Sequence, residues 1–211
     1  MVHDGTLVEA LRRGDRRGGE SLVDRYYGRV LRFFANKAPA AADELARRTF
    51  LACFEGLGDL RDPEGFRVFL FAIACDHLRA HYRRGLEGGG ALDLGACRAL
   101  DFDASPGRIE GEGAEHRELL AALRRIPAAA QVLLELAYWE ALSAAELAQV
   151  LAIPVDAVEA RLRRAHGLLG RELGGEVEAG DADALADLER RLRCLGDAGV
   201  GGWGASGRAS K

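Results

Sequence analysis

Apolar side chains recur at helical spacing along the first part of the chain, and this pattern predicts a bundle of helices. Thr6 and Glu9 have the spacing of a capping box, which predicts the start of a short first helix. The pair Gly18-Gly19 is expected to end that helix. A second helix is expected over residues 20–37, because its apolar side chains fall on one face. These side chains are Leu22, Tyr26, Val30 and Phe33.

Further helices are expected in the rest of this bundle. One is predicted over residues 41–57, with Gly56 at its end. Asp62-Pro63 has the order of a cap and a first-turn proline, which predicts another helix over residues 63–84. This helix is apolar nearly all round, so we expect it at the centre of the bundle. Its apolar side chains include Phe66, Phe69, Leu70, Phe71 and Ile73.

The periodicity stops over residues 85–115, which are rich in glycine and aspartate and therefore predict a flexible linker. Helical spacing resumes over residues 116–126, and Pro127 opens the next helix. Ser143 and Glu146 then form a second capping box, at the start of a helix that is expected to end near residue 151. A short turn joins it to a helix predicted over residues 155–173.

Two helices joined by a three-residue turn, the second one basic, have the plan of a helix-turn-helix motif. Ala148 is small where the helices must approach, Ile153 closes the turn, and Val158 and Leu162 face inward. The second helix can then enter the major groove of DNA. The spacing leaves an ordinary helical hairpin with a solvated basic face as the alternative. The side chains expected to contact duplex DNA are Ser143, Asp156, Ala157, Glu159, Ala160, Arg161, Arg163 and Arg164.

The second half of the chain resembles the promoter-binding domain of extracytoplasmic-function (ECF) sigma factors of bacterial RNA polymerase. The resemblance rests on short motifs in a fixed order. These are Leu-x-x-Ile-Pro at 123–127, Leu-Ser at 142–143, Ile-Pro-Val at 153–155 and Arg-Leu-x-Arg-Ala at 161–165.

The first half resembles the other domain of the same family. Residues 22–32 resemble its first helix and residues 45–54 its polymerase-docking helix. The run Phe-x-x-Phe-Leu-x-x-Ile-Ala at 66–74, continued to Arg84, resembles its promoter-melting helix. The resemblance implies an all-α fold of two small helical domains joined by a flexible linker, with a C-terminal helical extension. The expected ranges are 1–84 for the N-terminal helical bundle, 85–115 for the linker, 116–173 for the helix-turn-helix domain and 174–211 for the extension.

The resemblance also implies a role for each helix. The helix over 41–57 docks on the largest subunit of core RNA polymerase, through Asp43, Glu44, Arg47 and Arg48. Arg47-Arg48 stands where this family usually presents Gln-Glu. The helix over 63–84 contacts the minus-ten promoter element and helps to open it, and the helix over 155–173 reads the minus-thirty-five element as duplex. The side chains expected near unpaired bases are Phe69, Phe71, His77, Arg79, His81, Tyr82, Arg83 and Arg84.

Charge and motifs limit the other functions. The net charge of −4 and a pI of about 5.8 argue against nonspecific coating of nucleic acid, so any DNA contact requires local basic faces. The chain has no phosphate-binding glycine loop and no nucleophile elbow, so we expect no enzyme, no catalytic residue and no cofactor. His77 and His81 could share a helical metal site, but too few further ligands lie near them in the sequence, and no metal is expected.

The expected partners are core RNA polymerase and promoter DNA, with an anti-sigma protein as a third candidate. A helix-turn-helix regulator that does not join polymerase is the other function left open. The start of the chain lacks a signal-peptide pattern, and the longest apolar run, over 68–75, is too short to cross a bilayer. We therefore expect no membrane insertion and a cytoplasmic location.

The family resemblance ends at residue 173. An amphipathic helix is expected over residues 181–195, with a leucine stripe on one side. Such a stripe normally finds a partner, so we hypothesise that the extension docks on the chain's own domains and moderates activity. A passive tail is the alternative. The stripe is Leu185, Leu188, Leu192 and Leu195.

Overall fold

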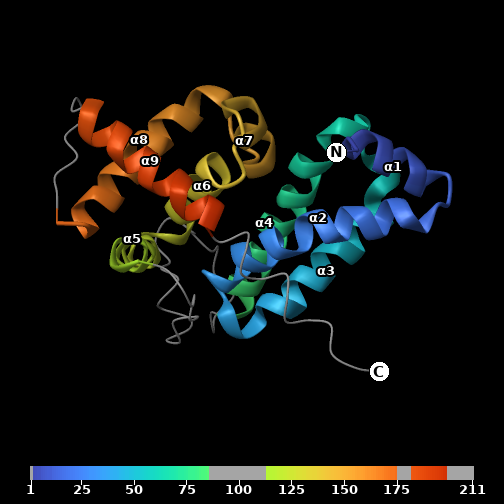
Figure 1. Ribbon diagram of the computed structural model, residues 1–211, viewed down its shortest axis with the longest axis horizontal. Helices are drawn as coiled ribbons and strands as arrows, with labels where there is room; N and C mark the ends of the chain where they lie inside the picture. Colours follow the sequence, from blue (N-terminus) through green and yellow to red (C-terminus); the bar gives the residue numbers. More distant parts are fainter. Residues whose placement is uncertain (1, 86–112, 175–181, 199–211) are drawn as a thin grey trace.

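The structure is a computed structural model that describes residues 2–85, 113–174 and 182–198 (Figure 1). These residues form helices joined by turns, which confirms the expected all-α fold. Residues 86–112 of the expected linker lie outside the described part. The N-terminal helices are α1 (Asp4–Arg12), α2 (Arg16–Ala35), α3 (Ala42–Glu55) and α4 (Phe66–Gly85). The later helices are α5 (Ala114–Arg125), α6 (Ala128–Tyr138), α7 (Ala144–Leu151), α8 (Val155–Glu172) and α9 (Ala182–Ala198).

The start of the chain differs from the expectation in two ways. The capping box at Thr6 is wrong, because α1 begins at Asp4 and no side chain caps it. The pair Gly18-Gly19 does not end this helix; it lies inside α2, and the break falls at Gly14, which has a positive φ of 88°. A β-carbon on Gly18 would lie 2.5 Å from the carbonyl oxygen of Leu7. The glycines therefore allow α1 and α2 to pack closely rather than breaking the helix.

The N-terminal core follows the predicted pattern. The apolar stripe on α2 is buried, and α4 lies against it with Phe66, Leu70 and Phe71 fully buried. Asp62 caps the turn before α4, since its side chain accepts a hydrogen bond from the backbone N–H of Glu64 at 3.1 Å. Within the bundle α4 packs on α1, α2 and α3, and it also packs on α7 in the second half of the chain.

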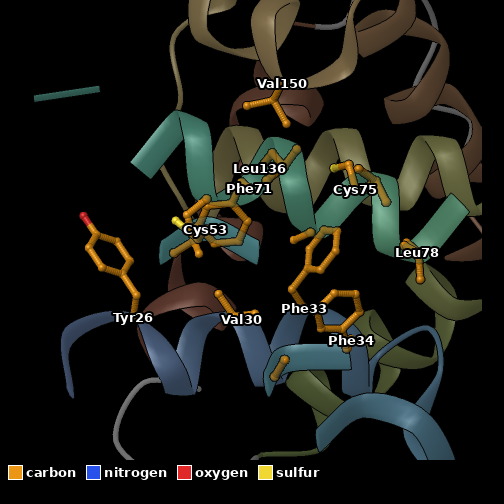
Figure 2. Packing of buried hydrophobic residues seen from close by; sticks show 14 of the residues in the cluster. Tyr26, Val30, Phe33, Phe34, Cys53, Phe71, Cys75, Leu78, Leu136 and Val150 are labelled. Atoms are coloured by element: carbon orange, nitrogen blue, oxygen red, sulfur yellow. The ribbon is translucent and has the colours of Figure 1, made fainter. Parts of the chain in front are cut away.

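Both halves of the chain contribute to one buried apolar cluster. Leu136 of α6 and Val150 of α7 belong to the same cluster as Phe33 of α2 and Phe71 of α4, as Figure 2 shows. In Figure 1 α1–α4 lie on one side and α5–α9 on the other. The two sides meet where α4 packs on α7. The division into two domains stays a prediction from the sequence, and the two halves are packed tightly together.

A buried ion pair lies between the halves. The Nζ atom of Lys37 is 2.5 Å from Oε2 of Glu135, and both side chains are excluded from solvent. Lys37 also donates to the carbonyl oxygen of Phe33 at 2.6 Å, and Gln131 donates to Oε1 of Glu135 at 2.9 Å. The hydroxyl of Tyr82 donates to the carbonyl oxygen of Lys37 at 3.0 Å. Desolvation lowers the pKa of Lys37, and the nearby Glu135 carboxylate opposes that shift.

This pair generates a stability prediction. Lys37→Met leaves the Glu135 carboxylate buried without its cation, and we expect the free energy of unfolding to fall by about 3–5 kcal/mol. The double variant Lys37→Met with Glu135→Leu removes both charges and should recover most of that loss. Urea unfolding of the wild type, the single variant and the double variant measures the difference. Equal losses in the two variants would contradict a coupled pair.

Candidate nucleic-acid interface

The helix-turn-helix motif has the local geometry that its sequence predicts. Ser143 accepts a hydrogen bond from the backbone N–H of Glu146 at 3.3 Å, and Glu146 accepts one from the backbone N–H of Ser143 at 2.7 Å. This confirms the second capping box. Desolvation acts in the opposite direction, but hydrogen bonds from Ser143 and Arg67 hold the pKa of Glu146 below its usual value. The start of α7 is therefore firmly fixed.

The turn of the motif relies on one residue in the left-handed conformation. Ala152 has a φ of 54° and ends α7, and the N–H of Ile153 donates to the carbonyl oxygen of Ala148 at 3.0 Å. Val158 is fully buried and Leu162 is half-buried, as expected for the inner face of α8. The side chains that remain form the outer face of this helix.

The outer face of α8 is exposed and mixed in charge. Arg163 lies 3.8 Å from Glu159, and both side chains are largely exposed. Within the part of the chain that the structure describes, Arg161 and Arg164 form no ion pair. Exposed guanidinium groups on a helix of this kind can bind phosphate oxygens or guanine edges. The structure leaves Ser143, Asp156, Glu159, Ala160, Arg161, Arg163 and Arg164 exposed, with Ala157 half-buried.

The side chains expected near unpaired bases fall into three groups on α4. Tyr82 and Phe71 are fully buried in the core, so neither can meet a base in this arrangement. Arg83 and Arg84 are exposed at the end of the helix. The half-buried group comprises Phe69, His77, Arg79 and His81.

Two of the half-buried side chains are held by other helices. Nδ1 of His77 lies 3.1 Å from the hydroxyl of Thr49 on α3, and desolvation lowers the pKa of the imidazole. Arg79 pairs with Asp76 at 2.7 Å and donates to the carbonyl oxygen of Leu151 on α7 at 3.3 Å. Arg79 is therefore shared between α4 and the helix-turn-helix motif.

The expected polymerase-docking side chains form a charged cluster on α3. Arg47 lies 2.7 Å from Asp43, and Arg48 lies 2.6 Å from Glu44, so the cluster balances its own charge. All four side chains are exposed, while Leu45 is buried in the bundle. Tyr27 donates to Asp43 at 2.6 Å, and desolvation together with this hydrogen bond raises the pKa of the phenol to about 12.

Sequence reasoning missed the polar groups that join the two halves. Glu135 and Glu140 are buried, and both contact cations of the N-terminal helices. Charged residues are rarely buried unless they are paired. Glu135 lies within the apolar run of α6, and a charged residue at such a position is the one signal in the sequence for a buried, paired carboxylate. None of the helices in the described ranges is long and apolar enough to span a membrane.

Comparison with known proteins gives matches over both halves. The family model for sigma-70 region 4 matches residues 116–166. The RNA polymerase sigma-H factor of Pseudomonas aeruginosa is 28% identical over 181 residues, which cover 81% of this chain and 93% of that protein. The ECF RNA polymerase sigma-E factor of Escherichia coli is 24% identical over 174 residues, covering 78% of this chain and 91% of that protein.

Two further matches differ in extent. The probable RNA polymerase sigma factor RfaY of Xanthomonas campestris is 32% identical over 138 residues, which are 64% of this chain but only 34% of that longer protein. The solved structure of CnrH in complex with the cytosolic domain of CnrY has a TM-score of 0.58 at 24% identity, covering 81% of this chain and 97% of that one. This likeness supports the fold. Taken with the order of the motifs, the matches support an ECF-type RNA polymerase sigma factor.

Proposed function

We propose that this sigma factor binds core RNA polymerase through the exposed face of α3 and directs it to promoters through α4 and α8. The face of α3 is the surface of Asp43, Glu44, Arg47 and Arg48. The chain would act in the cytoplasm, without catalytic chemistry of its own. The alternative, a DNA-binding regulator that does not join polymerase, predicts DNA binding without any contribution from α3.

The outer face of α8 carries the proposal. Its capped partner helix and its left-handed turn present Arg161 and Arg164 on the same side of one helix, three residues apart. Such a helix fits the minus-thirty-five element as duplex DNA. The exposed Arg83 and Arg84 and the half-buried His81 at the end of α4 suit the minus-ten element, where bases become unpaired.

The first experiment is reconstitution. Purified chain and core polymerase are mixed, and co-elution on gel filtration is followed by transcription from promoters selected out of a random library. Stable co-elution with promoter-dependent transcription supports the sigma function. DNA binding by the free chain without co-elution would favour the regulator.

A prediction concerns duplex recognition. Arg161→Ala or Arg164→Ala should weaken promoter binding by about 1–3 kcal/mol if the side chain contacts a base, or reduce the salt dependence of binding if it contacts phosphate. Binding isotherms of the holoenzyme at several salt concentrations separate the two cases. Arg17→Ala, at an exposed arginine of α2 far along the chain from α8, is the matched control. Unchanged binding in both α8 variants would contradict the assignment of α8.

A second prediction concerns polymerase. Arg47→Gln with Arg48→Glu frees the Asp43 and Glu44 carboxylates from their ion pairs and gives the surface the acidic character that the family usually presents. We expect this double variant to bind a standard bacterial core enzyme more tightly. Competition against the wild-type chain for limiting core measures the effect. Weaker binding would mean that the present surface already matches its own polymerase.

A further inference from the structure

The packing of α4 on α7 limits what this arrangement can bind. Nη2 of Arg67 on α4 lies 3.0 Å from Oε1 of Glu146 on α7, and Arg79 reaches the carbonyl oxygen of Leu151. By their names the minus-ten and minus-thirty-five elements are about 25 base pairs apart, or roughly 85 Å of duplex at about 3.4 Å per base pair. Helices in direct contact cannot occupy both elements at once. We call this packed state the closed arrangement.

The chain is long enough to leave the closed arrangement. Residues 86–112 separate α4 from α5 along the sequence. At about 3.3 Å per residue a segment of this length reaches roughly 90 Å when extended, which matches the separation of the two elements. Separation of α4 from α8 then requires the contacts of the closed arrangement to break.

Acidic side chains of α6 and of the segment directly after it hold the N-terminal half of the chain. Beyond the Lys37–Glu135 pair, Glu140 lies 3.4 Å from Arg29 and 3.8 Å from Arg32. Arg67 donates to the backbone carbonyl of Glu140 at 3.0 Å. Desolvation raises the pKa of Glu140, and the arginines oppose that shift. These contacts join the two halves and must break when the halves separate.

The extension packs on the second half of the chain. Leu188, Leu192 and Leu195 of α9 are buried in a second apolar cluster with Trp139 and side chains of α5 and α8. The indole N–H of Trp139 donates to the carbonyl oxygen of Leu192 at 3.0 Å. Figure 1 shows α9 crossing α8 and ending beside α6. The leucine stripe therefore docks on the chain's own second half.

The end of α9 also reaches the first half. Nη1 of Arg32 on α2 donates to the carbonyl oxygen of Gly196 at 2.5 Å, and its guanidinium lies 4.7 Å from the centre of the Trp139 ring. A cation at the C-terminal end of a helix is favoured by the helix dipole. Arg32 thus contacts α9, Trp139 and Glu140 together, and α9 supplies a contact that exists only when the halves are closed.

We propose that α9 is a built-in clasp, which holds the closed arrangement through Trp139 and Arg32 and thereby restrains promoter binding. The proposal rests on the sigma function given above. Releasing the clasp shifts the chain towards an open form, in which α4 and α8 are free to reach separate elements. The extension then sets the fraction of molecules that can initiate transcription, without touching DNA or polymerase itself.

Gly196→Ala tests the clasp. A β-carbon at Gly196 would lie 2.7 Å from Cδ1 and 3.1 Å from Cα of Trp139, so the end of α9 must move away. Gly167→Ala is the matched control, because its β-carbon meets nothing closer than 3.9 Å. Both changes favour the helix by themselves. A second variant, Arg32→Gln, removes the cation without altering α9.

Small-angle scattering measures the radius of gyration, and transcription with core polymerase at limiting sigma measures activity. Gly196→Ala and Arg32→Gln should each increase the radius and raise transcription by about fivefold or more, which is the usual lower range of coupling between sites. Gly167→Ala should behave as the wild type. If Gly196→Ala unfolds, as circular dichroism would show, Arg32→Gln is compared with Glu140→Gln, which weakens the Arg32–Glu140 pair but leaves the contact of Arg32 with α9. An effect of Arg32→Gln no larger than that of Glu140→Gln overturns the clasp. Wild-type radius, or unchanged or reduced transcription in folded variants, overturns the clasp.

Failure of the sigma function gives a different result. If neither the wild type nor any variant binds core polymerase, the proposed function falls, while the scattering data still report whether α9 holds the halves together. An increased radius without core binding would then leave a clasp on a protein of another function. An increased radius with core binding but no gain in transcription would mean that α9 holds the halves together without restraining activity.

Discussion

The burial of Lys37 against Glu135 constrains the rest of the structure. An ammonium group without contact to water is stable only when its carboxylate partner and the surrounding hydrogen bonds are in place. This requirement fixes the end of α2 against the middle of α6, and with it the position of α7 on α4. A buried ion pair adds little stability compared with apolar side chains, but a displaced partner is costly. The pair therefore specifies how the halves dock more than how strongly they do so.

Much of the helical architecture could be predicted from the sequence. The stripe on α2, the cap at Asp62, the box at Ser143 and the amphipathic α9 all depend on neighbours within a few residues. The error at Gly18 has a different origin. Glycine commonly ends helices, but here it permits a close approach between α1 and α2, and nothing local to the sequence distinguishes these two uses.

The candidate site likewise contains features that follow from nearby residues in the sequence and features that depend on distant ones. The exposed face of α8 and the charged cluster on α3 follow from helical periodicity, so the sequence places them correctly on the surface. Tyr82 on α4 shows the limit, because an aromatic residue near arginines suits either a base or a core. Its hydroxyl donates to the carbonyl oxygen of Lys37 in the turn after α2, a contact distant in the sequence. Contacts between residues nearly a hundred positions apart, such as Lys37 with Glu135, leave no periodic trace in one sequence.

The separation of Lys37 and Glu135 along the chain has a consequence for synthesis. A ribosome releases the N-terminal helices before it makes α6, so any structure that the nascent bundle forms at that stage leaves Lys37 without Glu135. Its charge enters the interior only when the second half arrives, which makes docking a late step that depends on closing a long loop. Every newly made molecule thus passes through a state in which its two halves are apart before it reaches the closed one.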